Sequence, residues 1–179
     1  TVTLGINGFG RIGRCTLAHI AEAARNDVQV VKLNATGPID TNAHLLRYDS
    51  VHGRFGGEVT VSGDTMDIGR GPMQVFSTYE PSELDWEGVD VVLECTGQFN
   101  DGARAGVHLE RGAKKVLISA PATNVDRTVV FGVNHRELLG EERMISNGSC
   151  TTNCLAPLAK VLHDAIGIER GIMTTVHSY

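Results

Sequence analysis

A cysteine and a histidine near the end of the chain are the residue types best suited to chemistry. Cys150 lies in the polar run Ser149–Cys154, and His177 ends the β-branched run Thr174–His177. Ser149 suits the N-cap of a following helix, so the thiol would lie at the positive end of the helix field, which favours the thiolate form. A thiolate and an imidazole together can attack a carbonyl carbon and form a covalent intermediate. The pair therefore predicts covalent catalysis.

Each of these assignments has an alternative. A cysteine in a folded domain is commonly a buried structural residue, although the polar neighbours of Cys150 disfavour that here. We interpret Cys154, Cys15 and Cys95 as small core residues. His177 taken alone fits a core or surface residue equally well, and only the preceding cysteine helix favours a catalytic role. No metal site is expected, because the sequence has no paired C-x-x-C motif and no set of four zinc ligands.

The chain also opens with a glycine motif, Gly8-Phe9-Gly10-Arg11-Ile12-Gly13, between a predicted strand and a predicted helix. In such a loop Gly8 permits a tight turn, Gly10 lets the backbone approach a pyrophosphate, and Gly13 allows close packing of helix and strand. The free N–H groups at the helix N-terminus would bind the phosphates. The alternative is a purely structural turn. Together with the cysteine and histidine, the motif predicts an enzyme that captures an aldehyde on sulfur and passes a hydride to a nicotinamide.

The usual acidic residue of a dinucleotide fingerprint is missing. It normally ends the second strand and binds the hydroxyl groups of the adenine ribose. Here that strand is followed by Asn34-Ala35-Thr36, while Asp27 precedes the strand and Asp40 lies well beyond it. We expect this difference to affect the choice between NAD and NADP.

Composition narrows the class of protein. The 179 residues are 41% hydrophobic and 21% charged with a net charge of −5, which is ordinary for a globular chain. The absence of a basic cluster disfavours nucleic acid and anionic membranes as partners. No apolar run approaches ~18 residues, so no membrane span is expected. The N-terminus enters a strand pattern without the basic region of a signal peptide, and the four cysteines favour a reducing cytoplasm.

The elements that would position these residues form an α/β pattern. A strand at 2–6, a helix at 11–25 and a strand at 28–33 predict a βαβ unit with parallel strands. Residues 50–79 carry many glycines and predict an antiparallel excursion at one sheet edge. The remaining predicted strands lie at 90–95, 115–119, 128–133 and 144–146, and the remaining helices at 41–48, capped by Thr41 or Asp40, and at 103–111.

The end of the chain predicts a second domain that is only begun. A helix at 150–166, kinked or broken early at Pro157, precedes a strand at 171–177. We therefore predict a Rossmann-type, doubly wound, mostly parallel sheet in residues 1–148 and the start of an α+β catalytic domain in residues 149–179. Because no later sequence can pair with the last strand, we expect the chain to be the first half of a longer protein.

Five segments of the chain resemble the phosphorylating glyceraldehyde-3-phosphate dehydrogenase family. They are Ile6–Arg14, Leu46–Phe55, Glu94–Gly97, Ser119–Ala122 and Ser146–Cys154, with Gly148 where the family usually has alanine. The resemblance implies a glycolytic enzyme that oxidises a triose phosphate with NAD or NADP and inorganic phosphate. It also implies a cytoplasmic homotetramer, with phosphate-binding and nicotinamide-binding residues downstream of this chain.

The resemblance implies a role for each matched residue. Cys150 would be the nucleophile, and His177 would be the general base that stabilises the oxyanion together with the backbone N–H of Cys150. Ser149 and Thr151 would help to hold the attacking phosphate. The positions implied along the dinucleotide are Asn7, Gly8, Gly10, Arg11, Ile12, Gly13, Asn34, Ala35, Thr96, Gly97 and Ser119.

Two departures from NAD-specific members of that family favour dual use of NAD and NADP. Ala35 stands where their ribose-binding aspartate would fall, and an arginine common near the adenine is replaced around Tyr79. Two other functions are also compatible with these residues. One is an erythrose-4-phosphate dehydrogenase, whose acyl-enzyme reacts with water instead of phosphate. The other is a nucleotide-binding or redox-sensing module without turnover.

Overall fold

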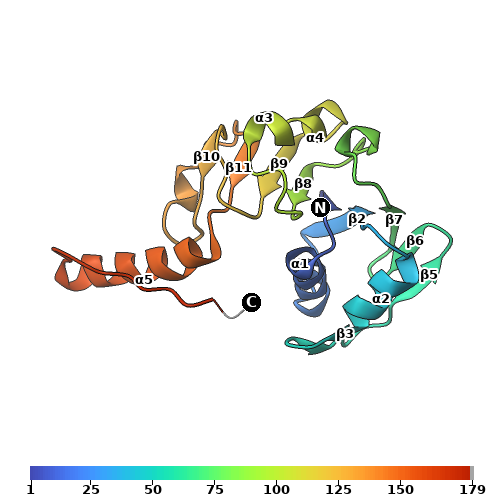
Figure 1. Cartoon of the computed structure of the whole chain (residues 1–179), viewed down its shortest axis with the longest axis horizontal. Coiled ribbons are helices and arrows are strands. Elements are labelled where there is room, and N and C mark those ends of the chain that lie inside the picture. The colour runs from blue at the N-terminus through green and yellow to red at the C-terminus, as the bar shows by residue number, and fades with distance from the viewer. Residues whose placement is uncertain (178–179) are drawn as a thin grey trace.

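A single mostly parallel sheet forms the centre of the protein (Figure 1). The computed structural model describes residues 1–177. Within them the sheet has nine strands in the order β10-β11-β9-β8-β1-β2-β7-β6-β5. Their bounds are β1 Val2–Asn7, β2 Val28–Asn34, β5 Thr60–Ser62, β6 Thr65–Asp67, β7 Pro72–Phe76, β8 Val91–Glu94, β9 Lys115–Ile118, β10 Arg127–Thr128 and β11 Met144–Ser146. The predicted α/β class and the parallel β1–β2 pairing are confirmed.

Helices cover both faces of this sheet. They are α1 Arg11–Glu22, α2 Ile39–Arg47, α3 Gly102–Ala105, α4 Val107–Glu110 and α5 Cys150–Ile166, with short 3-10 turns at Pro81–Glu83 and His135–Glu137. Leu17 of α1 and Leu46 of α2 pack with Ile6 and Leu33 in one buried cluster. Trp86 and Val92 belong to a second cluster with the partly buried Val31. Val30 and Val31 are thus placed in different clusters, as expected for a strand whose side chains alternate between two covered faces.

The glycine-rich segment forms the predicted excursion at the sheet edge. β5 pairs antiparallel with β6, and β6 pairs antiparallel with β7. β7 then returns parallel to β2 and joins the central sheet. A separate antiparallel pair, β3 Tyr48–Asp49 with β4 Gly53–Arg54, follows α2.

Several predicted boundaries are wrong. The first helix ends at Glu22 instead of residue 25, and α2 begins at Ile39 with Pro38 as N-cap and no side-chain cap. The helix predicted at 103–111 is two short helices that meet at Gly106. The strand predicted at 128–133 shrinks to β10 at Arg127–Thr128. The local sequence pattern did not predict where these helices and strands end, because caps and tertiary contacts decide where an element stops.

The last helix and the tail extend away from the sheet (Figure 1). α5 runs unbroken from Cys150 to Ile166 with Pro157 inside it, so the early break considered above does not occur. The strand predicted at 171–177 is wrong, because residues 168–177 contain no strand. A strand needs a neighbour to hydrogen-bond with, and the described part of the chain provides none there.

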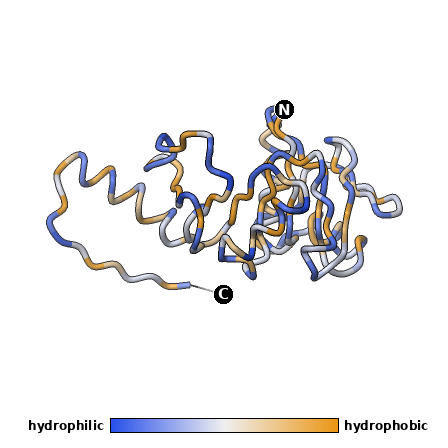
Figure 2. The backbone as a smooth tube through the Cα atoms, turned by 90° about the horizontal axis from the view of Figure 1, so that it is seen from above, coloured by the Kyte–Doolittle hydropathy of each residue, from blue (hydrophilic) through white to orange (hydrophobic). Residues whose placement is uncertain are grey.

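α5 has an unusual surface for a helix of this length. No side chain of α5 is buried within the described residues, although Leu158, Val161 and Ile166 are apolar and more than half exposed. Figure 2 shows hydrophobic positions along α5 and the tail, to one side of the main body. Among residues 1–177, no helix is both long and apolar enough to cross a bilayer. The domain division at 148/149 stays a prediction, and the last two residues of its second segment lie outside the described residues.

Candidate dinucleotide site and cysteine helix

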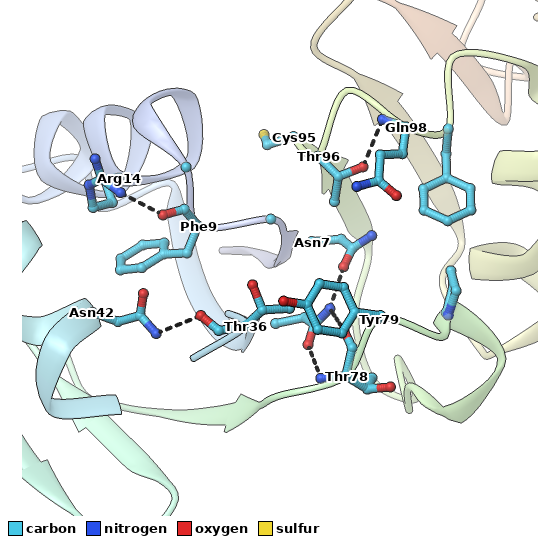
Figure 3. A pocket seen from close by; sticks show the side chains of 15 residues that line it. Asn7, Phe9, Arg14, Thr36, Asn42, Thr78, Tyr79, Cys95, Thr96 and Gln98 are labelled. Carbon is cyan, nitrogen blue, oxygen red and sulfur yellow. Dashed lines mark hydrogen bonds between the residues drawn. The ribbon is translucent and has the colours of Figure 1, made fainter. Parts of the chain in front are cut away.

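A cavity of about 360 Å³ lies at the carboxyl ends of adjacent central strands (Figure 3). Strands β8, β1, β2 and β7 are neighbours in the sheet and run parallel, so their carboxyl ends meet at one edge. Ligands of open α/β sheets bind at this edge. The cavity brings together five of the predicted cofactor-binding residues: Asn7, Gly8, Gly10, Asn34 and Thr96.

The glycine loop is held tightly between β1 and α1. Gly8 has a φ of +97°, and a Cβ atom there would lie 2.7 Å from the backbone nitrogen of Thr96. A Cβ atom at Gly13 would lie 2.2 Å from the carbonyl oxygen of Gly8. Both positions therefore require glycine, the first for its left-handed backbone and the second for close packing.

The N-terminus of α1 is open toward a ligand. Gly10 is the N-cap, and no side chain caps the first turn. A Cβ atom built at Gly10 would meet nothing within 4 Å, so the space beside this backbone is free. Uncapped N–H groups and the helix dipole attract an anion. The arrangement can therefore bind a pyrophosphate through the backbone.

The side chain of Arg11 is engaged elsewhere. Its Nη1 donates to both carboxylate oxygens of Asp49, at 2.9 and 3.0 Å. The backbone N–H of His52 and the Arg11 guanidinium hold the pKa of Asp49 well below its usual range. Arg11 and Ile12 do not line the cavity, and Ile12 is 52% exposed. The backbone N–H groups of these two residues lie in the first turn of α1.

The floor of the cavity is made of paired amides. Asn7 and Asn34 are 1% and 6% exposed, and the Nδ2 of Asn34 donates to the Oδ1 of Asn7 at 2.7 Å. Asn34 also donates to the carbonyl oxygen of Thr78 at 3.0 Å and accepts from its N–H at 3.1 Å. These bonds tie the ends of β1, β2 and the segment after β7 into one surface.

Ala35 does not line the cavity. Its side chain is 1% exposed, and its N–H donates to the carbonyl oxygen of Phe76 at 2.9 Å. The next residue, Thr36, lines the cavity instead, and its carbonyl oxygen accepts from the Nδ2 of Asn42 at 3.4 Å. Figure 3 shows Thr36 and Asn42 on one side of Asn7, with Thr96 and Gln98 on the other.

The turn after β8 forms the opposite wall. The N–H and Oγ1 of Thr96 donate to Glu94 at 2.8 and 2.5 Å, and Gln98 N–H donates to Thr96 Oγ1 at 3.1 Å. Burial raises the pKa of the Cys95 thiol to about 11, while a hydrogen bond with Ser119 acts in the opposite direction. Gly97 and Ser119 adjoin this wall without lining the cavity.

Sequence reasoning missed several lining residues, among them Asn42, Thr78, Gln98 and Phe99. A usable signal existed for most of them. Thr78, Gln98 and Phe99 follow closely after the carboxyl ends of β7 and β8, where ligands of parallel sheets bind. Asn42 lies within α2, and its place in the cavity wall follows only from the tertiary packing of that helix.

The cysteine helix begins as the sequence predicts. Ser149 is the N-cap of α5, and its Oγ accepts from the N–H of Thr152 at 2.9 Å. Asn153 donates to the carbonyl oxygens of Asn147 and Ser149 at 2.7 and 2.9 Å, which fixes the turn before the helix. Cys150 is exposed in the first turn. Cys154 is also exposed, so its interpretation as a core residue is wrong for this structure.

His177 is not assembled with the cysteine. The side chain is exposed, and its Nε2 lies 3.0 Å from the Oγ1 of Thr175. No hydrogen bond joins Cys150 and His177 among the described residues. Their pairing was expected from a strand at 171–177, and that strand is absent. Ser149 and Thr151 do lie beside Cys150 at the start of α5.

The chain is similar to known proteins over its whole length. Residues 2–102 match the family profile described as glyceraldehyde 3-phosphate dehydrogenase, NAD binding domain, and residues 149–179 match the profile of the C-terminal domain. The chain is 59% identical over 181 residues to glyceraldehyde-3-phosphate dehydrogenase of Xanthobacter flavus and 56% identical over 179 residues to that of Cereibacter sphaeroides. Both alignments cover 100% of this chain and 54% of the relative, so the chain spans about half the length of these curated relatives. The chain belongs to the glyceraldehyde-3-phosphate dehydrogenase family.

Proposed function

We propose that the protein carrying this chain oxidises glyceraldehyde 3-phosphate to 1,3-bisphosphoglycerate with NAD or NADP and inorganic phosphate. One observation carries the proposal. An exposed thiol lies in the capped first turn of α5, in a chain whose sheet edge holds an uncapped helix N-terminus beside a cavity. A thiol at a helix N-terminus suits nucleophilic attack, and an open helix N-terminus suits a dinucleotide pyrophosphate.

The chemistry uses the chain's own residues as follows. The Sγ of Cys150 adds to the aldehyde carbon, and the backbone N–H of Cys150 donates to the resulting oxyanion. The imidazole of His177 carries the proton lost from the Cys150 thiol to the oxyanion, which becomes a hydroxyl group. His177 accepts this hydroxyl proton again as the C–H bond breaks and the hydride leaves the carbon, which leaves a thioester on Cys150. The bound nicotinamide supplies the acceptor for the hydride. An oxygen of inorganic phosphate then attacks the thioester carbon, and the C–S bond breaks to give an acyl phosphate and free thiolate.

His177 must approach Cys150 for this reaction. It lies in an exposed segment without secondary structure, and α5 carries an uncovered apolar surface next to that segment. We propose that pairing of residues 171–177 as a strand brings the imidazole to the thiol. We propose that the hydroxyl groups of Ser149 and Thr151, which flank Cys150 in sequence, help to hold the attacking phosphate.

We further propose that the protein uses both NAD and NADP. Ala35 offers neither a carboxylate to bind the ribose hydroxyls nor a negative charge to repel a 2′-phosphate. Thr36, whose hydroxyl group can donate a hydrogen bond, lines the cavity wall where Ala35 does not.

A cytoplasmic homotetramer remains our proposal for the assembled enzyme, and light scattering on a size-exclusion column would measure its subunit number.

A steady-state assay of the complete protein tests the proposal. We expect reduced dinucleotide to form from glyceraldehyde 3-phosphate only when inorganic phosphate is present. Oxidation of erythrose 4-phosphate without a phosphate requirement would favour the erythrose-4-phosphate enzyme. Dinucleotide binding without turnover of either sugar would favour the non-catalytic module. The Cys150→Ser variant is the control, because it retains the dinucleotide cavity and lacks the nucleophile.

A further inference from the structure

A row of polar side chains crosses the carboxyl edge of the sheet beneath the dinucleotide cavity. Glu94 ends β8, Asn7 ends β1 and Asn34 ends β2. The strand register places Asn7 opposite both Glu94 and Asn34, and places Asn34 opposite Phe76 of β7. Thr78 follows Phe76 by two residues. The row therefore spans neighbouring strands and joins the two walls of the cavity.

Glu94 is the charged member of this row, and it is 1% exposed. Its Oε1 accepts from the N–H and Oγ1 of Thr96 at 2.8 and 2.5 Å. Its Oε2 accepts from the Nδ2 of Asn7 at 2.6 Å and lies 2.9 Å from the Nε2 of His108. Asn7 and Thr96 therefore donate to the carboxylate, and the direction of the contact with His108 depends on which ring nitrogen of His108 carries the proton.

The side chain of His108 fixes Glu94 from the other side. The indole N–H of Trp86 can only donate, and it lies 3.0 Å from the Nδ1 of His108. Nδ1 must therefore accept, so the imidazole proton lies on Nε2 and is donated to Glu94. His108 and Trp86 are both 0% exposed, and neither lines the cavity. The mechanism proposed above does not use either residue.

An acceptor at one end of the row sets the direction of every hydrogen bond along it. A side-chain amide has one donor end and one acceptor end. Because Asn7 must turn its NH2 toward Glu94, its oxygen faces Asn34, which must present its own NH2 in return. The oxygen of Asn34 then accepts from the N–H of Thr78.

We infer that Glu94 is a positioning residue for dinucleotide binding, and that His108 holds it in place. The carboxylate of Glu94 orients the amides of Asn7 and Asn34 and the turn at Thr96, and so decides which polar atoms face the cavity. Glu94 does not contact the ligand and acts through these three residues. The inference rests on the proposed function, because the orientation matters to a ligand only if the cavity binds a dinucleotide.

Glu94→Gln tests the inference directly. Glutamine keeps the shape of the side chain but presents an NH2 group to at least one of the donors around it, so the amide row loses its single direction. We expect the Kd for NAD of the complete protein to rise about tenfold. The rate of Cys150 alkylation should stay unchanged, because that thiol lies on α5. Glu110→Gln is the matched control, since it removes the same charge from an exposed position on α4.

A pair of His108 variants keeps the test decisive if Glu94→Gln fails to fold. His108→Gln retains a donor for Glu94 and should bind NAD within about threefold of wild type, whereas His108→Leu removes the donor and should bind about tenfold more weakly. The positioning role would be overturned if folded Glu94→Gln bound NAD as tightly as wild type does. It would also be overturned if His108→Gln and His108→Leu bound NAD with the same affinity. A wild-type protein that binds no dinucleotide would instead overturn the proposed function.

Discussion

The carbonyl oxygen of Gly8 lies 2.2 Å from the point where a Cβ atom of residue 13 would be placed. The obstacle is backbone, so it cannot turn aside as a flexible side chain would. Helix α1 therefore packs directly on the turn that precedes it, which brings its uncapped N-terminus to the edge of the cavity. This contact explains why the third glycine of the motif is needed in a site that it does not itself line.

Gly13→Ala should destabilise the protein and weaken dinucleotide binding. The added methyl group forces the turn and the helix apart, and overpacking of this kind costs roughly 1–3 kcal/mol. The free energy of unfolding in urea and the Kd for NAD, measured on the same preparation, check the prediction.

Gly10→Ala is the matched comparison. Gly10 has a φ of −71°, and a Cβ atom there would meet nothing within 4 Å. We expect no loss of stability, and a gain of up to ~1 kcal/mol because alanine restricts the unfolded chain. NAD binding should nevertheless weaken, since the methyl group would fill space beside the helix N-terminus. Unaltered affinity in Gly10→Ala would show that the pyrophosphate lies elsewhere.

Ala35→Asp should shift cofactor preference toward NAD by roughly tenfold or more, where ~1.4 kcal/mol corresponds to one decade. The carboxylate would bind the ribose hydroxyls and repel a 2′-phosphate. The ratio of kcat/KM for the two cofactors measures the shift, with Ala35→Asn as the uncharged control of similar shape. A wild type that already favours NAD a thousandfold would contradict the predicted dual use.

Cys150 should be the first of the four cysteines to react with iodoacetamide at neutral pH. It is exposed in the first turn of a helix, whereas burial raises the pKa of Cys95 to about 11 and leaves that thiol almost entirely protonated. Peptide mass mapping over time gives the order of labelling. Cys154 is the informative competitor because it is also exposed but lies one turn farther along α5. Faster labelling of Cys154 or Cys95 would argue against Cys150 as the nucleophile.

His177→Asn should slow the hydride step by ~10²–10⁴-fold, which is the usual effect of removing a general base. Single-turnover kinetics of the complete protein measure that step separately from product release. His163→Asn provides the control, because His163 lies on α5 with its Nδ1 accepting from the N–H of Ile168 at 3.2 Å. An unchanged hydride rate in His177→Asn would remove this residue from the mechanism.

Asp90 should contribute to the loss of stability in acid. The ammonium of Lys114 and the N–H and hydroxyl of Thr3 hold the pKa of Asp90 well below its usual range. A carboxyl group with a depressed folded-state pKa stabilises the protein above its unfolded value of about 3.9, and this contribution is lost as the pH falls below that value. Melting temperatures between pH 7 and pH 3 should therefore fall less steeply in Asp90→Asn than in wild type. Parallel curves for the two proteins would contradict this.

The sequence by itself determined the elements whose cause is local. Runs of β-branched residues specified β1 and β2, and the glycines at positions 8 and 13 specified a turn that only glycine can form. The N-cap at Ser149 could also be predicted, because its hydrogen bond reaches only to Thr152. Each of these features depends on residues a few positions apart, so a short window of sequence contains its physical cause.

Only the tertiary structure decided which side chains meet at the sheet edge. Asn7 lies 87 residues from Glu94 and 101 residues from His108, and parallel pairing of β1 with β8 brings Asn7 beside Glu94. Thr36 lines the cavity wall and Ala35 does not, because the side chain of Ala35 is buried in the core. Tertiary structure also explains why the strand predicted at 171–177 does not form. Its local pattern favours a strand, but a strand forms only where another strand completes its hydrogen bonds, and such pairing is not encoded in the segment itself.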